Sequence, residues 1–304
     1  MSEPNLRINL AGIDMPTPVL AASGTFGYGE EFADFVNLSR LGGVMVKCTT
    51  LAPRHGNNGV RIAETPGGML NAIGLENPGI DYFLSDILPR IKDKMNVIVN
   101  ISGTTAEEYG ILAEKLDVPG VCAIELNVSC PNVKDGGIIF GTDPRALSAV
   151  VTNAKTHTKK PIIVKLSPNV TDICLLAKTA EEAGADMLSL INTLMGMAID
   201  IRTEKPILGN STGGLSGACI KPVALRMVWQ TAQKVHIPII GMGGITKWQD
   251  AVEFLLAGAA AVAVGTANFI NPAVTAEIID GLTDYLREKN LSDVSELTGR
   301  VNRA

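Results

Sequence analysis

The chain has 304 residues, 46% of them hydrophobic and 19% charged, and its formal net charge at pH 7 is −5. This composition is sufficient for a large hydrophobic core. The sequence has no Lys/Arg-rich run, which argues against a nucleic-acid-binding protein. No apolar run approaches the roughly 18 residues of a membrane span. The first five residues lack the basic and apolar regions of a secretion signal, so we expect a cytoplasmic protein.

The cysteines and histidines do not form a metal motif. None of the five cysteines stands in a C-x-x-C pair, which argues against a disulfide framework, a zinc site or an iron–sulfur cluster held by this chain alone. The three histidines are isolated, and we expect them to be surface or structural residues. No metal site is predicted.

Short apolar runs alternate with helical patterns along the chain. After an opening ribbon (6–15), the expected strands are 18–22, 43–46, 97–101, 121–127, 162–166, 187–191, 239–243 and 260–265. The expected helices are 30–41, 82–94, 106–116, 143–156, 172–183, 221–235, 248–257 and 272–288. In the first of these helices Phe32, Phe35, Val36 and Leu38 are candidate core positions. A long segment rich in Gly, Pro and Asn, 51–78, is predicted to be irregular and functional, and 192–219 is a second long Gly-rich insertion.

Eight apolar strands separated by helices are typical of a parallel sheet that is buried on both faces. In a chain of this length they predict a single-domain (β/α)8 TIM barrel over residues 1–304, with long insertions after strands two and six. The rival is an open doubly wound sheet. That fold usually carries G-x-G-x-x-G after its first strand, and residues 23–27 (Ser-Gly-Thr-Phe-Gly) do not match it.

The strand 121–127 ends at Asn127 and is followed by Val-Ser-Cys-Pro-Asn. Pro131 stops the strand, so Cys130 is expected on a loop between two asparagines, Asn127 and Asn132. A buried structural cysteine is an equally good interpretation from position alone, because a thiol's reactivity depends on its surroundings.

In a barrel of this kind the chemistry lies at the carboxyl ends of the strands. Six of the eight expected ends carry a polar or cationic side chain: Ser23, Lys47, Asn100, Asn127, Lys165 and Asn192. One lysine alone could be explained as a solvent-exposed residue at the end of a strand. Two lysines directed at one mouth are costly unless something anionic or electron-rich lies between them.

The last two strand ends are different, because they carry Gly243, Gly244, Gly265 and Thr266. Strands seven and eight form the phosphate site of many barrels, and glycine lets the backbone approach a ligand closely. With two lysines, several asparagines and a thiol at the same mouth, these residues favour flavin mononucleotide (FMN) over a hydrolytic site. A lysine would stabilise the charge of the reduced ring, and the thiol would act as acid or base.

At this point the sequence resembles the dihydroorotate dehydrogenase family over essentially its whole length. The motifs that carry the resemblance are 127–132 (Asn-Val-Ser-Cys-Pro-Asn), 71–75 (Asn-Ala-Ile-Gly-Leu), 164–168 (Val-Lys-Leu-Ser-Pro), 191–193 (Ile-Asn-Thr) and 213–217 (Gly-Gly-Leu-Ser-Gly). A cysteine as the base marks class 1 of the family, because class 2 uses serine. Segments 192–196 and 213–217 are most similar to the NAD-linked class 1B catalytic subunit.

The resemblance implies oxidation of (S)-dihydroorotate to orotate in pyrimidine biosynthesis. Cys130 would remove the C5 proton while hydride leaves C6 for N5 of FMN, and Lys47 and Lys165 would assist. The implied substrate residues are Lys47, Asn71, Ile73, Gly74, Leu75, Asn127, Asn132, Asn192 and Thr193. The implied FMN residues are Ser23, Lys47, Cys48, Asn100, Asn127, Lys165, Ile191, Gly217, Gly243, Gly244, Gly265 and Thr266. The loop from 130 to about 140 would be a lid over the substrate.

Class 1B enzymes pass electrons through an FAD and a [2Fe-2S] cluster to NAD+. This chain has neither a cysteine quartet nor a dinucleotide fingerprint. The resemblance therefore implies a second subunit that carries both groups, in a heterotetramer of two catalytic and two electron-transfer subunits.

Three alternatives stay open at this stage. The first is an FMN-dependent barrel reductase of another pyrimidine, which would share the phosphate glycines but not the asparagines around Cys130. The second is a non-redox phosphosugar isomerase or lyase, which would normally supply a carboxylate or histidine base at the mouth. The third is a binding or scaffold barrel, which leaves the two lysines unexplained. A colourless purified protein would favour the second.

Overall fold

The computed structural model describes residues 3–128 and 140–303, and its centre is a closed barrel of eight parallel strands. In barrel order these strands are β3 (Val19–Ala21), β4 (Gly43–Thr49), β7 (Val97–Ile101), β8 (Val121–Asn127), β9 (Ile162–Lys165), β10 (Met187–Leu190), β15 (Ile239–Met242) and β16 (Ala261–Val264). The barrel closes where β16 pairs with β3, Val262 lying beside Val19. The predicted TIM-barrel fold is confirmed.

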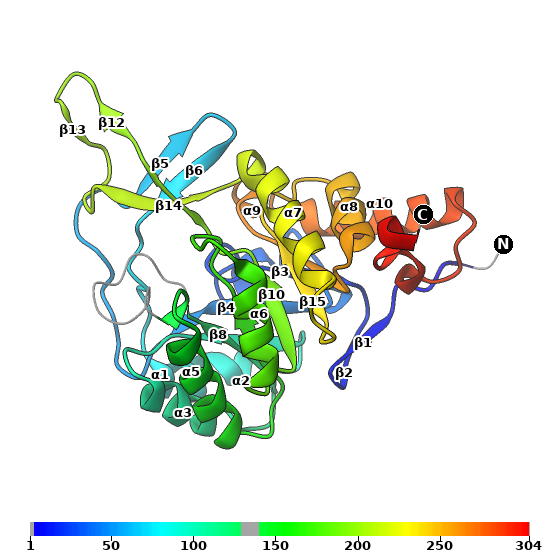
Figure 1. The fold of residues 1–304 in the computed structure, drawn as a ribbon, viewed down its shortest axis with the longest axis horizontal. Helices are drawn as coiled ribbons and strands as arrows, with labels where there is room; N and C mark the ends of the chain where they lie inside the picture. The colour runs from blue at the N-terminus through cyan, green and yellow to red at the C-terminus, as the bar shows by residue number, and fades with distance from the viewer. Residues whose placement is uncertain (1–2, 129–139, 304) are drawn as a thin grey trace.

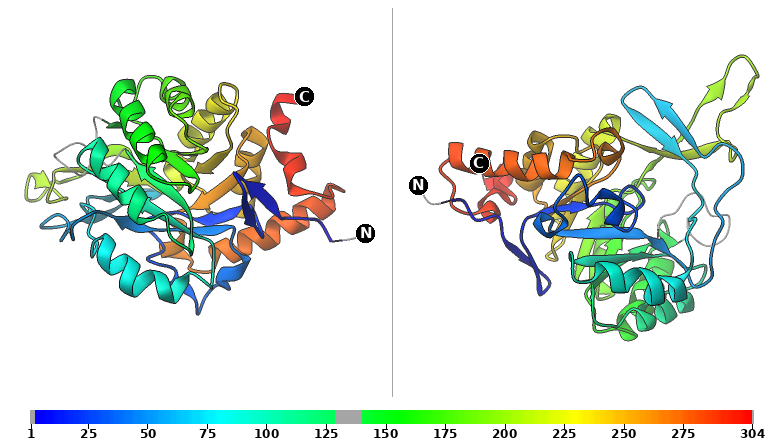
Figure 2. Two further views of the ribbon diagram at one scale, coloured as in Figure 1. Left: turned by 90° about the horizontal axis from the view of Figure 1, so that it is seen from below. Right: turned by 180° about the vertical axis from the view of Figure 1, so that it is seen from behind.

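Helices cover the outside of the barrel (Figure 2). They are α1 (Ile80–Tyr82), the π-helix η3 (Phe83–Ile87), α2 (Leu88–Ile91), α3 (Ala106–Lys115), α5 (Pro144–Thr156), α6 (Ile173–Glu182), α7 (Lys221–Ala232), α8 (Trp248–Ala257), α9 (Ala267–Ile270) and α10 (Val274–Glu288). Thr105, Asp143 and Asp172 begin α3, α5 and α6 by accepting hydrogen bonds from first-turn amides. Each of the remaining predicted helices is present, with ends shifted by a few residues, except 30–41.

The barrel interior has two chemically different layers. Ile98, Ala123 and Met187 belong to an apolar cluster inside the barrel. Two residues further along their strands, on the same inward face, lie Asn100, Glu125 and Ser189. The core is therefore apolar toward the amino ends of the strands and polar toward the carboxyl ends.

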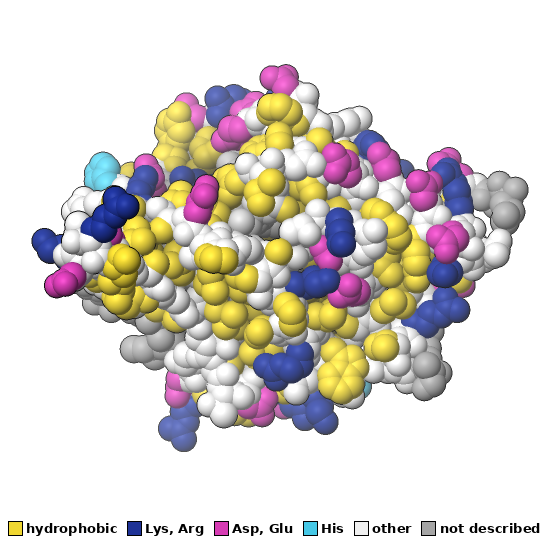
Figure 3. Space-filling model, turned by 90° about the horizontal axis from the view of Figure 1, so that it is seen from above, with side chains coloured by type: hydrophobic (Ala, Val, Ile, Leu, Met, Phe, Trp, Pro, Cys, Tyr) yellow, Lys and Arg dark blue, Asp and Glu magenta, His cyan; other side chains and the backbone are white. Residues whose placement is uncertain are grey.

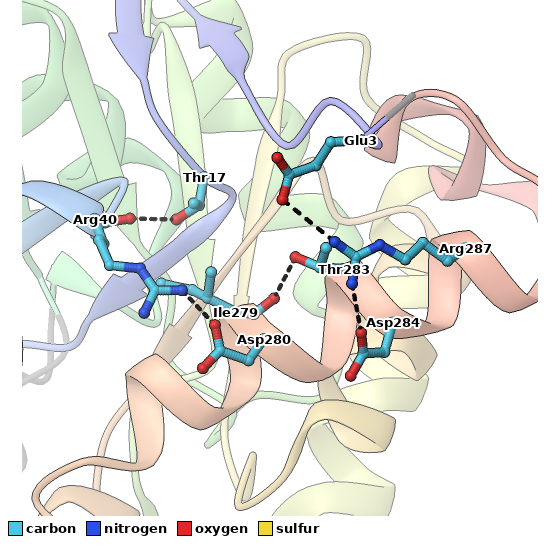
Figure 4. A network of polar contacts seen from close by, with 8 residues as sticks. All are labelled: Glu3, Thr17, Arg40, Ile279, Asp280, Thr283, Asp284 and Arg287. Carbon is cyan, nitrogen blue, oxygen red and sulfur yellow. Dashed lines mark hydrogen bonds and ion pairs between the residues drawn. The ribbon is translucent and has the colours of Figure 1, made fainter. Parts of the chain in front are cut away.

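The amino end of the barrel is closed by the hairpin of β1 (Ile8–Leu10) and β2 (Ile13–Met15), whose Leu10, Ile13 and Met15 join the inner apolar cluster. The chain termini lie at this end of the molecule (Figures 1 and 2). Helix α10 is tied to earlier segments by ion pairs of Arg40 with Asp280 and of Arg287 with Glu3 (Figure 4).

Both insertions contain strands, so the prediction that 51–78 is irregular is wrong for part of that segment. They contribute β5 (Ile62–Thr65), β6 (Gly68–Asn71), β11 (Leu194–Met197) and β14 (Thr212–Ser216), which form one antiparallel four-stranded sheet in the order β11-β14-β6-β5. A further ribbon, β12 (Ile199–Asp200) with β13 (Lys205–Pro206), projects from it (Figure 1). Pairing between segments about 140 residues apart cannot be inferred from local patterns.

The prediction of a helix at residues 30–41 is wrong. The segment contains two short 3-10 turns, η1 (Glu30–Phe32) and η2 (Leu38–Arg40). Asn37 adopts an extended conformation and its side chain accepts a hydrogen bond from the Ser39 amide, so it caps a new turn instead of continuing a helix. Val36 and Leu38 are buried as expected, but Phe35 is 57% exposed and is not a core residue.

Candidate active site

A cavity of about 460 Å³ lies at the carboxyl ends of the barrel strands. Its volume is in the range of cofactor and substrate sites. Residues at or just after the end of every barrel strand except β7 line it, and one wall comes from β5, β6 and β14 of the additional sheet. No helix in the described part of the chain is long and apolar enough to cross a membrane.

The cavity brings together most of the residues singled out from the sequence. It is lined by Ser23, Lys47, Cys48, Asn71, Ile73, Gly74, Leu75, Asn127, Lys165, Ile191, Asn192, Thr193, Gly217, Gly243, Gly244, Gly265 and Thr266. Asn100 does not line the cavity, because its side chain is buried in the barrel interior. Cys130 and Asn132, with nearly all of the expected lid, lie outside the described residues. Which side chains touch a ligand stays a prediction.

One edge of the cavity is built from backbone. Gly243 and Gly244 follow β15 with φ angles of 120° and 78°, which favour glycine. A Cβ atom on Gly244 would lie 2.7 Å from the backbone nitrogen of Lys221. Among the described residues, the amides of Gly243, Gly244, Gly265 and Thr266 have no hydrogen-bond partner. Four uncovered N–H groups at one edge form a cradle for an anion.

The loop behind this cradle is held by a buried carboxylate. Asp250 accepts hydrogen bonds from the Thr246 amide and hydroxyl, at 2.9 and 2.8 Å, and its ion pair with Lys221 has a 2.8 Å N–O distance. Burial alone would raise the pKa of Asp250, but these partners together lower it below its usual value of 3.8. The cradle therefore rests on a fixed, ionised support at neutral pH.

Another edge is built from side chains. Lys165 is 6% exposed, and its ammonium donates to Ser23 Oγ at 3.3 Å. Asn192 Nδ2 donates to Asn127 Oδ1 at 3.3 Å, while Asn192 Oδ1 accepts from the Thr193 amide at 2.8 Å. The two asparagines thus hold each other's amides in one orientation, as recognition of a flat polar ligand requires.

Beneath this edge lies Glu125, which the sequence analysis did not single out. Its side chain is fully buried, and the carboxylate accepts from Asn100 Nδ2 at 2.5 Å and from Ser189 Oγ at 2.6 Å. Lys165 Nζ is 4.0 Å from Glu125 Oε2. The signal that could have revealed it is a glutamate at an inward position of an otherwise apolar strand, since a buried charge requires partners.

The additional sheet and its loops supply further residues that the sequence analysis missed. Arg61 and Glu76 line the cavity and form an ion pair with a 2.7 Å N–O distance; this hydrogen bond to Arg61 lowers the pKa of Glu76. Leu75, which directly precedes Glu76 in the chain, adopts a left-handed φ of 59°. Figure 3 shows the molecule from above relative to Figure 1; on this face apolar side chains lie among charged side chains of both signs.

Comparison with known proteins agrees with this geometry. A family model described as dihydroorotate dehydrogenase matches residues 5–286. Relatives named "Dihydroorotate dehydrogenase B (NAD(+)), catalytic subunit" include those of Desulforamulus reducens, 58% identical over 98% of this chain and 99% of the relative, and Bacteroides fragilis, 56% identical over the same shares. The relative from Geotalea uraniireducens is 56% identical over 99% of both chains.

A solved structure, the dihydroorotate dehydrogenase (DHODH) of Eimeria tenella in complex with ferulenol, has the same fold. Its TM-score is 0.83, with 24% identity over 99% of this chain and 90% of that chain. At this identity the likeness concerns the fold.

Proposed function

The chain belongs to the dihydroorotate dehydrogenase family, and from this premise we propose how its cavity works. It is an oxidoreductase that oxidises (S)-dihydroorotate to orotate in pyrimidine biosynthesis. The observation that carries the proposal is that one cavity joins an uncovered backbone cradle to a lysine and a set of oriented asparagines. FMN and the substrate would share this cavity.

The residues present fit FMN. The amides of Gly243, Gly244, Gly265 and Thr266 suit a phosphate, which needs several N–H donors. Asn100 is proposed as an FMN contact from the family motif alone, because it lies below the cavity wall; its Oδ1 is buried and has no partner among the described residues. The other proposed FMN contacts are on the cavity wall: Ser23, Lys47, Cys48, Asn127, Lys165, Ile191 and Gly217. Bound FMN would supply the acceptor for the hydride that leaves C6 of dihydroorotate.

The substrate would lie against the asparagine edge. Orotate carries carbonyls, ring N–H groups and a carboxylate, and Asn71, Asn127 and Asn192 can both donate to and accept from such groups. Lys47 would pair with its charge. Ile73, Gly74, Leu75 and Thr193 would pack around it, all of them on the cavity wall. Asn132 is proposed as a further contact from the family motif alone.

Cys130 is proposed as the base that takes the C5 proton. It follows β8 by three residues, and β8 ends at Asn127 on the cavity wall. The Lys165 ammonium, fixed near Ser23, would offset the negative charge that the reaction delivers to the cavity. Asn127 and Asn192 hold the substrate plane while the proton moves.

We further propose that electrons leave through a partner that carries FAD and a [2Fe-2S] cluster and reduces NAD+. The relatives' name, "catalytic subunit", supports a separate partner. We expect a heterotetramer with two copies of each subunit. Natively purified enzyme should contain iron and FAD beside FMN, and full NAD+ reduction by an iron-free preparation would refute this part.

The test of the central proposal is the visible spectrum of the purified chain under anaerobic conditions. We expect a flavin band that bleaches when dihydroorotate is added. A yellow protein that does not bleach would retain FMN but refute the substrate. A protein that stays colourless after incubation with FMN would refute the flavin.

A further inference from the structure

We infer that Glu125 is a positioning residue that sets the reduction potential of the flavin site. The inference rests on the proposed binding of FMN, and it assigns a role to a group that does not itself line the cavity. The carboxylate would act through the two residues that it holds, Lys165 and Asn100.

The geometry places one negative charge beneath the cavity floor. Glu125 is 0% exposed and Lys165 is 6% exposed, so water screens their interaction very little. Nζ of Lys165 is 3.3 Å from Ser23 Oγ and 4.0 Å from Glu125 Oε2. Lys165 therefore lines the cavity while its ammonium is within ion-pair distance of the buried carboxylate.

The same carboxylate fixes which way the Asn100 amide points. An ionised carboxylate can only accept hydrogen bonds, so it binds the NH2 group of Asn100, here at 2.5 Å. This leaves Asn100 Oδ1 as the buried atom without a partner among the described residues. A neutral group in place of Glu125 could bind either end of the amide, and the acceptor would lose its fixed orientation.

The electrostatic consequence has a definite sign. The negative charge of Glu125 partly cancels the positive charge of Lys165 and so disfavours the extra negative charge of reduced flavin. Removing it should raise the reduction potential. A nearby charge at a buried site commonly shifts an ionisation equilibrium by one to three powers of ten. We expect at least a tenfold shift of the redox equilibrium toward reduced flavin, about 30 mV for two electrons.

The test is anaerobic redox titration of the full FMN-loaded chain as wild type, Glu125→Gln and Ser189→Ala. Glutamine keeps the size of glutamate and removes the charge. Ser189→Ala is the matched control, because it removes the other hydrogen bond to the same carboxylate, at 2.6 Å, and leaves the charge in place. We expect an upward shift in Glu125→Gln and none in Ser189→Ala.

Each outcome decides the matter. An unchanged potential in FMN-loaded Glu125→Gln, or an equal rise in Ser189→Ala, overturns the inference and leaves the proposed function intact. A wild-type chain that binds no FMN overturns both.

If Glu125→Gln does not retain FMN, unfolding of the apo chain provides a second measurement. Glu125→Gln and Lys165→Met would each leave one buried charge without its partner, so the double variant should be less destabilised than the sum of the two. Strict additivity would overturn the inference.

Discussion

The two edges of the cavity recognise their ligands with different parts of the chain. After β15 and β16 the chain offers backbone amides, held open by glycines with positive φ angles. After β8, β9 and β10 it offers the side chains of Asn127, Lys165 and Asn192, which are oriented by partners on neighbouring strands. A backbone cradle can serve any phosphorylated ligand, whereas side chains at fixed positions select one ring system.

This difference explains why the two edges carry different information. Barrels with other chemistries share glycines after strands seven and eight. The phosphosugar and pyrimidine-reductase alternatives could therefore not be separated there. The asparagine edge distinguishes these alternatives. Substitutions at the backbone edge should change cofactor retention, whereas substitutions at the side-chain edge should change the rate and the substrate affinity.

The largest effect is expected on the rate. Cys130→Ser should retain FMN and bind orotate, but oxidise dihydroorotate about 10²- to 10⁴-fold more slowly, the usual contribution of a general base. Stopped-flow measurement of flavin bleaching checks this. Equal rates for the variant and wild type would remove Cys130 from the mechanism.

At the backbone edge, Gly244→Ala should weaken FMN binding. Alanine would adopt a φ of 78° with its Cβ 2.7 Å from the Lys221 nitrogen. Strain of about 1–3 kcal/mol corresponds to roughly a 5- to 150-fold loss of affinity, measurable by fluorescence titration. Gly12→Ala is the control, because Gly12 has a φ of 85° and open space around its Cβ position in the β1–β2 turn. Equal FMN loss in both variants would contradict a local cradle.

At the side-chain edge, Asn192→Ala should lower orotate affinity roughly 10- to 150-fold, because hydrogen bonds to a charged ligand contribute about 1.5–3 kcal/mol. FMN affinity should stay within twofold of wild type. Spectral titration with orotate measures the first quantity and FMN titration the second. Loss of FMN with unchanged orotate affinity would reverse the roles of the two edges.

The smallest effect concerns the support of the cradle. Asp250→Asn should reduce the free energy of unfolding by about 1 kcal/mol at neutral pH. Because the folded pKa of Asp250 lies below its usual value of 3.8, its stabilisation is complete above that value and is lost as the pH falls through the folded pKa. The difference between wild type and variant in denaturant unfolding should therefore shrink below pH 3.8. A difference that does not depend on pH would contradict an ionised Asp250.

The fold was predictable where the signal is local. Eight apolar strands recur at regular spacing, and parallel closure brings their ends to one mouth, so Ser23, Lys165 and Gly243 could be placed together from order alone. The sheet of β5, β6, β11 and β14 could not be predicted, because its pairing is non-local. The prediction of a helix at 30–41 failed because the side-chain cap at Asn37 begins a new turn, although the apolar residues have helical spacing.

In the active site too, features that depend on contacts between distant residues could not be predicted from the sequence. The sequence identifies Asn100 and Lys165 as strand-end residues, but the two differ in the structure, since Asn100 lies below the cavity and Lys165 lines it. Glu125 was missed because its role depends on Asn100, 25 residues away in the chain, and on Lys165 of the neighbouring strand β9. The assignment of residues 1–304 to one domain stays a prediction.

A crystal structure of the chain with FMN and orotate would test the division of the cavity most directly. The account predicts the phosphate on the amides of Gly243, Gly244, Gly265 and Thr266, with orotate against Asn71, Asn127 and Asn192. A phosphate bound at the asparagine edge, or an orotate that does not contact these side chains, would contradict it.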